Sequence, residues 1–158
     1  MTDKADTGFA PRGSRSDIEE GLTLSPRFDK DGLIPAIAAD AATGEVLMLA
    51  YMNKEALSKT IATGEAHYWS RSRQEIWRKG ATSGNTQQIV DLRIDCDQDA
   101  ILMLVRQRGS GASCHVGYSS CFFRAIPTGT PPSPDLKLEY REAGKAFDPA
   151  EVYGKSSS

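Results

Sequence analysis

The stretch QQIVDLRIDCD, residues 87 to 97, alternates apolar and polar side chains over most of its length. An extended strand points successive side chains to opposite faces, so the alternation predicts one apolar and one charged face. These faces would carry Val90, Leu92, Ile94 and Cys96 on one side, and Asp91, Arg93, Asp95 and Asp97 on the other. The pattern predicts a long β-strand that ends in an acidic run.

Segments on both sides of this strand also read as strands, joined by short turns. We expect strands over residues 33–40 and 45–52 as one hairpin, 66–70 and 75–80 as a second hairpin, 100–107 as a buried strand, and 121–126 as the last core strand. A helix should begin after the capping residue Asn53 and end at Gly64. Residues 135–142 could form a further strand or a short helix. The fold class is therefore α+β, mainly antiparallel strands with one or two short helices.

Length and composition suit one domain in a chain of 158 residues. We expect a disordered tail over residues 1–21, one domain over residues 22–141, and a flexible tail over residues 142–158. The formal net charge of -2 gives no basic field for nucleic acid. No apolar run reaches membrane-helix length and the amino-terminal segment has no apolar core for secretion, so we expect a cytoplasmic protein without membrane contact.

The acidic run DCDQD, residues 95 to 99, places carboxylates at alternate positions: Asp95, Asp97 and Asp99. An extended backbone would put all three on one side, where their charges repel. Oxygen ligands at this density suit Mg²⁺ or another hard cation. Charge runs are also common on solvated surfaces, so the run alone leaves both readings open.

The three cysteines, Cys96, Cys114 and Cys121, do not follow a zinc-finger spacing. Three protein ligands with one open position are typical of a catalytic zinc ion. The alternative is that Cys96 is a small buried hydrophobe on its strand. Cys114 and Cys121 flank the polar segment HVGYSS, which is a poor place for an inert thiol, and this favours zinc.

Basic and hydroxyl side chains cluster around the second predicted hairpin. Two guanidinium groups, an ammonium group and loop N–H groups could bind phosphate, although such residues are also ordinary on surfaces. The candidates are Arg71, Arg73, Lys79, Thr82, Ser83 and Gly84. Of the two histidines, His67 fits a structural role in an aromatic strand, and His115, next to Cys114, is better placed to transfer a proton.

Five segments together resemble the phosphoribosyl-AMP cyclohydrolase family, over about Asp31 to Phe122. They are GLIPAIAADAATGEVLMLAYMNKEAL, GEAHYWSRSR, WRKGATSGN, DCDQD and CHVGYSSCF, in the order and spacing of that family. Ala112 and Ser113 stand where many members have a proline. About thirty-five residues follow Phe122, so the chain resembles the monofunctional form.

The resemblance implies an intertwined homodimer with one zinc per subunit, shared between Cys96 of one subunit and Cys114 and Cys121 of the other. A separate Mg²⁺ would bind Asp95, Asp97 and Asp99. The implied reaction is the third step of histidine biosynthesis, in which zinc-activated water adds at C6 of the adenine of 1-(5-phosphoribosyl)-AMP and the N1–C6 bond breaks. The basic residues would orient the two 5′-phosphates, and His115 could manage a proton at the ring nitrogen.

Two other functions remain open. A zinc nucleoside deaminase would also attack a ring carbon, but its H-x-E and P-C-x-x-C motifs are missing. A non-catalytic zinc-binding module would account for the cysteines equally well, yet it would leave the three aspartates without a role.

Overall fold

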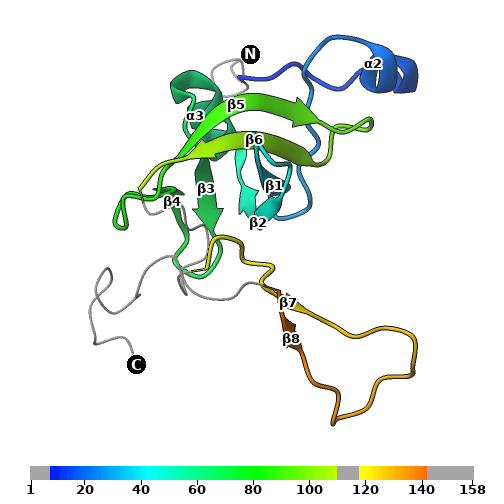
Figure 1. The fold of residues 1–158 in the computed structure, drawn as a ribbon. Helices are drawn as coiled ribbons and strands as arrows, with labels where there is room; N and C mark the ends of the chain where they lie inside the picture. The colour runs from blue at the N-terminus through cyan, green and yellow to red at the C-terminus, as the bar shows by residue number, and fades with distance from the viewer. Residues whose placement is uncertain (1–7, 110–117, 142–158) are drawn as a thin grey trace.

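The computed structural model describes residues 8–109 and 118–141, and Figure 1 shows the arrangement of their elements. The elements are α2 (Arg15–Glu20), β1 (Ile34–Asp40), β2 (Val46–Met52), α3 (Lys54–Thr63), β3 (His67–Ser70), β4 (Glu75–Arg78), β5 (Gln87–Ile94), β6 (Ile101–Gln107), β7 (Arg124–Ala125) and β8 (Glu139–Tyr140). This content confirms the predicted α+β class.

The main sheet has the strand order β4-β3-β2-β1-β6-β5. Its neighbouring strands are antiparallel, except that β1 and β6 run parallel. Both predicted hairpins are present. In the first, the Asp40 carboxylate accepts from the backbone N–H groups of Ala42 and Thr43, and Gly44 takes a φ of 81° that other residues rarely adopt.

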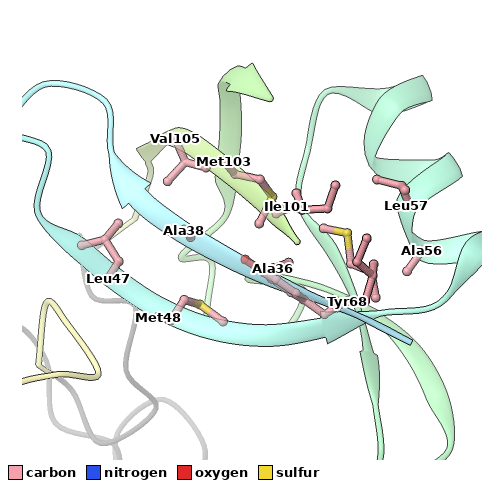
Figure 2. Close-up of a cluster of buried hydrophobic side chains, with 13 residues drawn as sticks. Ala36, Ala38, Leu47, Met48, Ala56, Leu57, Tyr68, Ile101, Met103 and Val105 are labelled. Carbon is pink, nitrogen blue, oxygen red and sulfur yellow. The ribbon is translucent and has the colours of Figure 1, made fainter. Parts of the chain in front are cut away.

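The core lies where β1, β2 and β6 meet α3 (Figure 2). Helix α3 is capped as predicted, because the Asn53 side chain accepts from the Ala56 N–H and Gly64 ends the helix with a φ of 75°. Leu57 on this helix is 1% exposed, and burying it stabilises the fold by roughly 2 kcal/mol. Ile61, by contrast, is 46% exposed.

Strand β5 departs from the predicted alternation at a β-bulge. The pairing with β6 shifts register between Ile89 and Asp91, which turns the following side chains to the opposite face. Ile89, Leu92 and Ile94 therefore pack against the core, whereas Val90 is 49% exposed. The prediction that Val90 shares a face with Leu92 and Ile94 is wrong, because alternation assumes an uninterrupted strand.

The sheet curls so that the start of β5 approaches the start of β3. Glu65 and Gln88 form an isolated antiparallel bridge, and the Ala66 N–H donates to the Gln87 carbonyl at 3.0 Å. The Glu65 carboxylate also accepts from Arg78 at 2.8 Å. These contacts bring the β4–β5 connection to one rim of the sheet.

The segment predicted as the last core strand lies outside the main sheet. Only Arg124–Ala125 of residues 121–126 is extended as β7, and it pairs with β8 in a separate two-stranded sheet. In Figure 1 this ribbon projects away from the main sheet. The prediction of a core strand is wrong, because this apolar run pairs with β8 and not with a strand of the main sheet. The alternative of a short strand within residues 135–142 is confirmed by β8.

The amino-terminal segment contains a short helix, which corrects the expectation of a disordered tail up to residue 21. Helix α2 is held by a capping box, in which Ser14 and Asp17 each accept from the backbone N–H of the other. The helix sequence, RSDIEE, has Ile18 as its one apolar residue, so it shows no apolar periodicity that would predict a helix. Within the described ranges, neither helix has the length and apolar character needed to cross a bilayer.

Candidate functional site

The three aspartates gather at the tip of the β5–β6 hairpin. Oxygen atoms of Asp95, Asp97 and Asp99 all lie within 4.8 Å of one another. Strand β5 ends at Ile94, so the carboxylates converge through a turn and not along an extended backbone as expected. The grouping is as predicted, but its structural origin was wrong.

Asp95 organises this turn through its own carboxylate. Its Oδ1 accepts from the backbone N–H groups of Asp99 at 2.9 Å and Ala100 at 3.1 Å. Partial burial raises the pKa of Asp95, but these hydrogen bonds and one from the Asp99 carboxyl outweigh it, so the pKa falls below the ordinary value. The Asp95 side chain is therefore a stable anion that faces both the turn and its acidic neighbours.

Asp99 shows the opposite effect. Hydrogen bonds from the protonated Asp99 carboxyl to its neighbours raise the pKa of Asp99 to about 6. The bond to Asp95 contributes most, followed by the bond to Asp97. Three carboxylates this close repel one another when all are ionised. A hard divalent cation would offset the same repulsion, so the donor set fits Mg²⁺.

Cys96 and Cys121 are both exposed in the described chain. Cys96 lies in the turn formed by residues 95–99, here called the acidic turn, and not on the apolar face of β5. The prediction of that apolar placement is therefore wrong. The alternative of a buried hydrophobic cysteine does not hold in the isolated chain either, because Cys96 is exposed. Cys121 is tied to β2 because its N–H donates to the Leu47 carbonyl at 2.7 Å. Cys114 and His115 lie outside the described residues.

The two cysteines occupy different ends of the central strands. β2 and β6 flank β1 on opposite sides, so they lie about 10 Å apart. Leu47, next to Cys121, falls between the β1 positions Ala38 and Ala39, whereas β6 begins opposite Ala36. This adds roughly 7 to 10 Å along the strands. A zinc ion holds each sulfur at about 2.3 Å, so Cys96 and Cys121 of one chain cannot bind the same ion.

A buried polar pair lies beneath the strand to which Cys121 is attached. The Tyr68 hydroxyl donates to Gln87 Oε1 at 2.7 Å, and both residues are fully buried. Burial raises the pKa of Tyr68, and the charge of nearby Cys121 raises it further. Tyr68 also packs against Trp77 with ring centroids 5.0 Å apart, so it is part of the aromatic core.

Arg71 and Arg73 lie in the exposed turn between β3 and β4. The Arg71 guanidinium stacks over the Tyr51 ring at 4.2 Å. Arg73 donates to the Ser70 hydroxyl at 3.4 Å and forms an ion pair with Glu75 at 3.7 Å. These contacts hold both guanidinium groups on the same turn of the hairpin. Because the turn is exposed, the two groups can bind an anion there.

Lys79, Thr82, Ser83 and Gly84 lie at the other end of the same hairpin. The Lys79 ammonium is 5.8 Å from the Trp77 ring centre, and the residue is 7% exposed. Ser83 Oγ accepts from the Asn85 N–H at 3.2 Å, which shapes the loop. Strands β3 and β4 separate this group from the arginine turn by about 10 Å. The structure therefore divides the predicted phosphate-binding residues into two groups.

His67 fits the structural role favoured for it. Its Nδ1 lies 2.9 Å from the Glu65 carbonyl, and its backbone N–H donates to Thr60 Oγ1 at 3.0 Å. The residue is 9% exposed and links α3 to the sheet.

Gln98, in the middle of the acidic turn, was not identified from the sequence. It is 4% exposed and has a φ of 60°. Its side chain contacts the amino-terminal segment, for example by accepting from the Ser25 N–H at 2.8 Å. The signal for Gln98 is its residue type. The centre of a tight turn usually carries glycine or asparagine, and a glutamine there is unusual.

Comparisons with known proteins agree on one family. The phosphoribosyl-AMP cyclohydrolase family model matches residues 48–123. The chain is similar to proteins named phosphoribosyl-AMP cyclohydrolase from Nitrobacter hamburgensis (51% identity over 91% of this chain and 95% of the relative), Caulobacter vibrioides (56%; 77% and 87%) and Rhodopseudomonas palustris (54%; 88% and 90%). The matched region contains the acidic turn, both hairpin groups and all three cysteines. The chain therefore belongs to the phosphoribosyl-AMP cyclohydrolase family.

Proposed function

We propose that this protein is a phosphoribosyl-AMP cyclohydrolase, acting in the third step of histidine biosynthesis. It would add water at C6 of the adenine in 1-(5-phosphoribosyl)-AMP and break the N1–C6 bond. The observation that carries the proposal is identity of 51 to 56% to proteins of that name over most of the chain. The acidic turn adds support, because it provides the hard-cation ligands that a diphosphorylated substrate requires.

Zinc would be held by Cys96, Cys114 and Cys121, and when bound it lowers the pKa of a coordinated water towards neutrality. Thiolate sulfur is a suitable ligand, and both described thiols are exposed. Because Cys96 and Cys121 are too far apart within one chain, the proposal requires Cys96 from one subunit and the other two cysteines from a second. We therefore propose a homodimer with one zinc per subunit.

The projecting β7–β8 ribbon supports a second copy as the partner. A two-stranded ribbon is marginally stable alone in water. Large apolar side chains are exposed on the ribbon and next to it. Tyr140 of β8 is 67% exposed, and the adjoining Phe122 and Ile126 are 57% and 66% exposed. Such surfaces mark interfaces in soluble proteins. The ribbon follows directly after Cys121, so packing against a second subunit would also bring this cysteine towards the partner.

The remaining residues would bind and orient the substrate. Asp95, Asp97 and Asp99 would hold Mg²⁺ near a phosphate. The arginine turn and the Lys79 loop, about 10 Å apart, would each face one of the two 5′-phosphates. His115 would donate or accept a proton at the ring nitrogen as the N1–C6 bond breaks.

The test is metal analysis of the purified protein combined with an assay on phosphoribosyl-AMP. A cyclohydrolase should open the ring without releasing ammonia and should contain about one zinc per chain. Ammonia release would indicate a zinc deaminase instead. Stoichiometric zinc with no turnover, at saturating Mg²⁺, would indicate a binding module and contradict the proposal.

A further inference from the structure

We propose that Gln98 is a positioning residue whose side chain fastens the amino-terminal segment, residues 12–27, against the acidic turn and holds the turn in its cation-binding shape. This inference rests on the proposed cation site. Residues 12–27 precede the part of the chain that the family model matches, so the segment would add a support outside that region.

The Gln98 side chain is fully engaged by backbone groups of the segment. Its Oε1 accepts from the Ser25 N–H at 2.8 Å. Its Nε2 donates to the carbonyls of Ile18 at 3.0 Å and Thr23 at 3.2 Å. The Gln98 backbone carbonyl also accepts from the Arg27 N–H at 2.7 Å. One nearly buried side chain therefore links the acidic turn to three points of a distant segment.

The backbone conformation of Gln98 indicates that these contacts compensate for strain. Its φ of 60° lies in the left-handed region, which is unfavourable for a residue with a Cβ. Among the described residues, Gln74, with a φ of 55°, is the other case outside glycine. Glycine would make this turn without strain, so the glutamine side chain supplies something that glycine would not.

The acidic turn needs such support because the three carboxylates that it brings together carry charges of the same sign. Three carboxylates within 4.8 Å repel one another before a cation binds. Asp95 restrains the turn from inside. From outside, the Arg12 guanidinium donates to the carbonyls of Ser25 at 2.9 Å and Asp97 at 3.0 Å. A turn held from both sides loses less conformational freedom on binding, which increases affinity.

The experiment measures Mn²⁺ affinity by electron paramagnetic resonance, with Mn²⁺ as the probe for the hard-cation site, in the full-length protein without substrate. Gln98→Gly relieves the backbone strain and removes the side chain, whereas Gln98→Ala removes the side chain and keeps the strain. Gln74→Gly is the matched control, because the residue type and the φ are similar but the side chain bonds to the Arg71 carbonyl in another turn.

We expect both Gln98 variants to weaken Mn²⁺ binding about five- to tenfold, as the loss of hydrogen bonds worth about 1 kcal/mol implies. Gln74→Gly should bind like the wild type. Wild-type affinity in Gln98→Gly, with or without loss in Gln98→Ala, would overturn the inference, because the side chain would then be dispensable. A wild-type protein that binds no Mn²⁺ would overturn it together with the cation site.

A second measurement does not depend on a metal or on activity. Amide hydrogen exchange of residues 95–100 should be faster in Gln98→Gly than in the wild type, while the core strands β1 and β6 stay protected. Unchanged exchange in the turn would contradict positioning by Gln98. Fast exchange throughout β1 and β6 would show that Gln98→Gly unfolds. The Mn²⁺ measurement would then be made on Gln98→Asn, because asparagine tolerates the same φ. Wild-type Mn²⁺ affinity in Gln98→Asn would overturn the inference.

Discussion

Cys121 combines an exposed thiol with a fixed backbone position, as a metal ligand requires. Its N–H is bonded to the Leu47 carbonyl, and the neighbouring Ser120 hydroxyl donates to the Val46 carbonyl at 2.8 Å. Neither bond uses the sulfur atom. Replacement of the thiol therefore leaves both of these backbone attachments to β2 available.

We expect Cys96→Ser, Cys114→Ser and Cys121→Ser each to lose zinc, because a three-ligand site has no spare donor. Turnover should fall by on the order of 100-fold or more, since changes that merely disturb metal ligands typically cost 10- to 100-fold. Zinc content by mass spectrometry and kcat would be measured together. A variant with full zinc and full activity would remove its cysteine from the proposed site.

Asp97→Asn should separate the two metals. The substitution removes one carboxylate from the acidic turn, so the Mg²⁺ concentration for half-maximal activity should rise about tenfold, while zinc content stays unchanged. Without metal, the melting temperature should not fall, because one repulsive charge has been lost. Parallel loss of zinc would show that the two proposed sites are not independent.

Among the elements, the β4–β5 connection has the tightest packing near the candidate phosphate residues. Gly80 has a φ of 88°, and a Cβ there would lie 2.4 Å from the Thr86 nitrogen. A Cβ added at Gly109 would lie 2.5 Å from both Asn85 Oδ1 and the Gly84 carbonyl oxygen. The loop that carries Thr82 and Ser83 is therefore formed by backbones that approach each other where side chains would collide.

Gly80→Ala should destabilise the protein more than the control Gly44→Ala. Both positions have positive φ, so each substitution introduces strain of about 1 to 2 kcal/mol. A Cβ at Gly44 meets no atom within 4 Å, whereas at Gly80 it adds an overpacking cost of about 1 to 3 kcal/mol. Urea unfolding would measure both. Equal losses of unfolding free energy would show that the loop can shift to accommodate the methyl group.

At the scale of the whole molecule, the curled sheet separates the functional groups. The acidic turn with Cys96 lies beyond one end of the β5–β6 pair, and Cys121 lies beside the start of β2. Figure 1 shows the turn that joins β5 to β6. The β7–β8 ribbon, with the exposed apolar residues Phe122 and Ile126 beside it, follows Cys121 in the chain. If the cysteines bind zinc as proposed, the site would require two chains, because Cys96 and Cys121 of one chain lie at different ends of the central strands.

Mixing two inactive variants tests this arrangement. If Cys96 of one subunit completes the site of Cys114 and Cys121 in the other, a heterodimer of Cys96→Ser and Cys114→Ser has one intact site. With random exchange of equal amounts, about a quarter of wild-type activity should return, because about half of the dimers are mixed. Subunit exchange would be verified independently with labelled protein. No recovery after verified exchange would contradict the shared site.

Local sequence patterns determined the family and most elements of the main sheet, together with helix α3. Apolar and aromatic runs joined by turn residues predicted the strands of both hairpins, and Asn53 and Gly64 predicted the limits of α3, because caps and turns depend on neighbours in the chain. The carboxylate group was also predictable, since its members lie within five consecutive residues.

Only the tertiary structure decided how distant segments meet. The parallel pairing of β1 with β6, the bulge that exposes Val90, and the separate β7–β8 ribbon depend on which strands compete for each edge. The attachment of Gln98 to Ser25 joins residues 73 positions apart. The distance between Cys96 and Cys121 follows from strand order. Such contacts have no local signature, because their free energy comes from burial and hydrogen bonds between segments that the chain brings together only on folding.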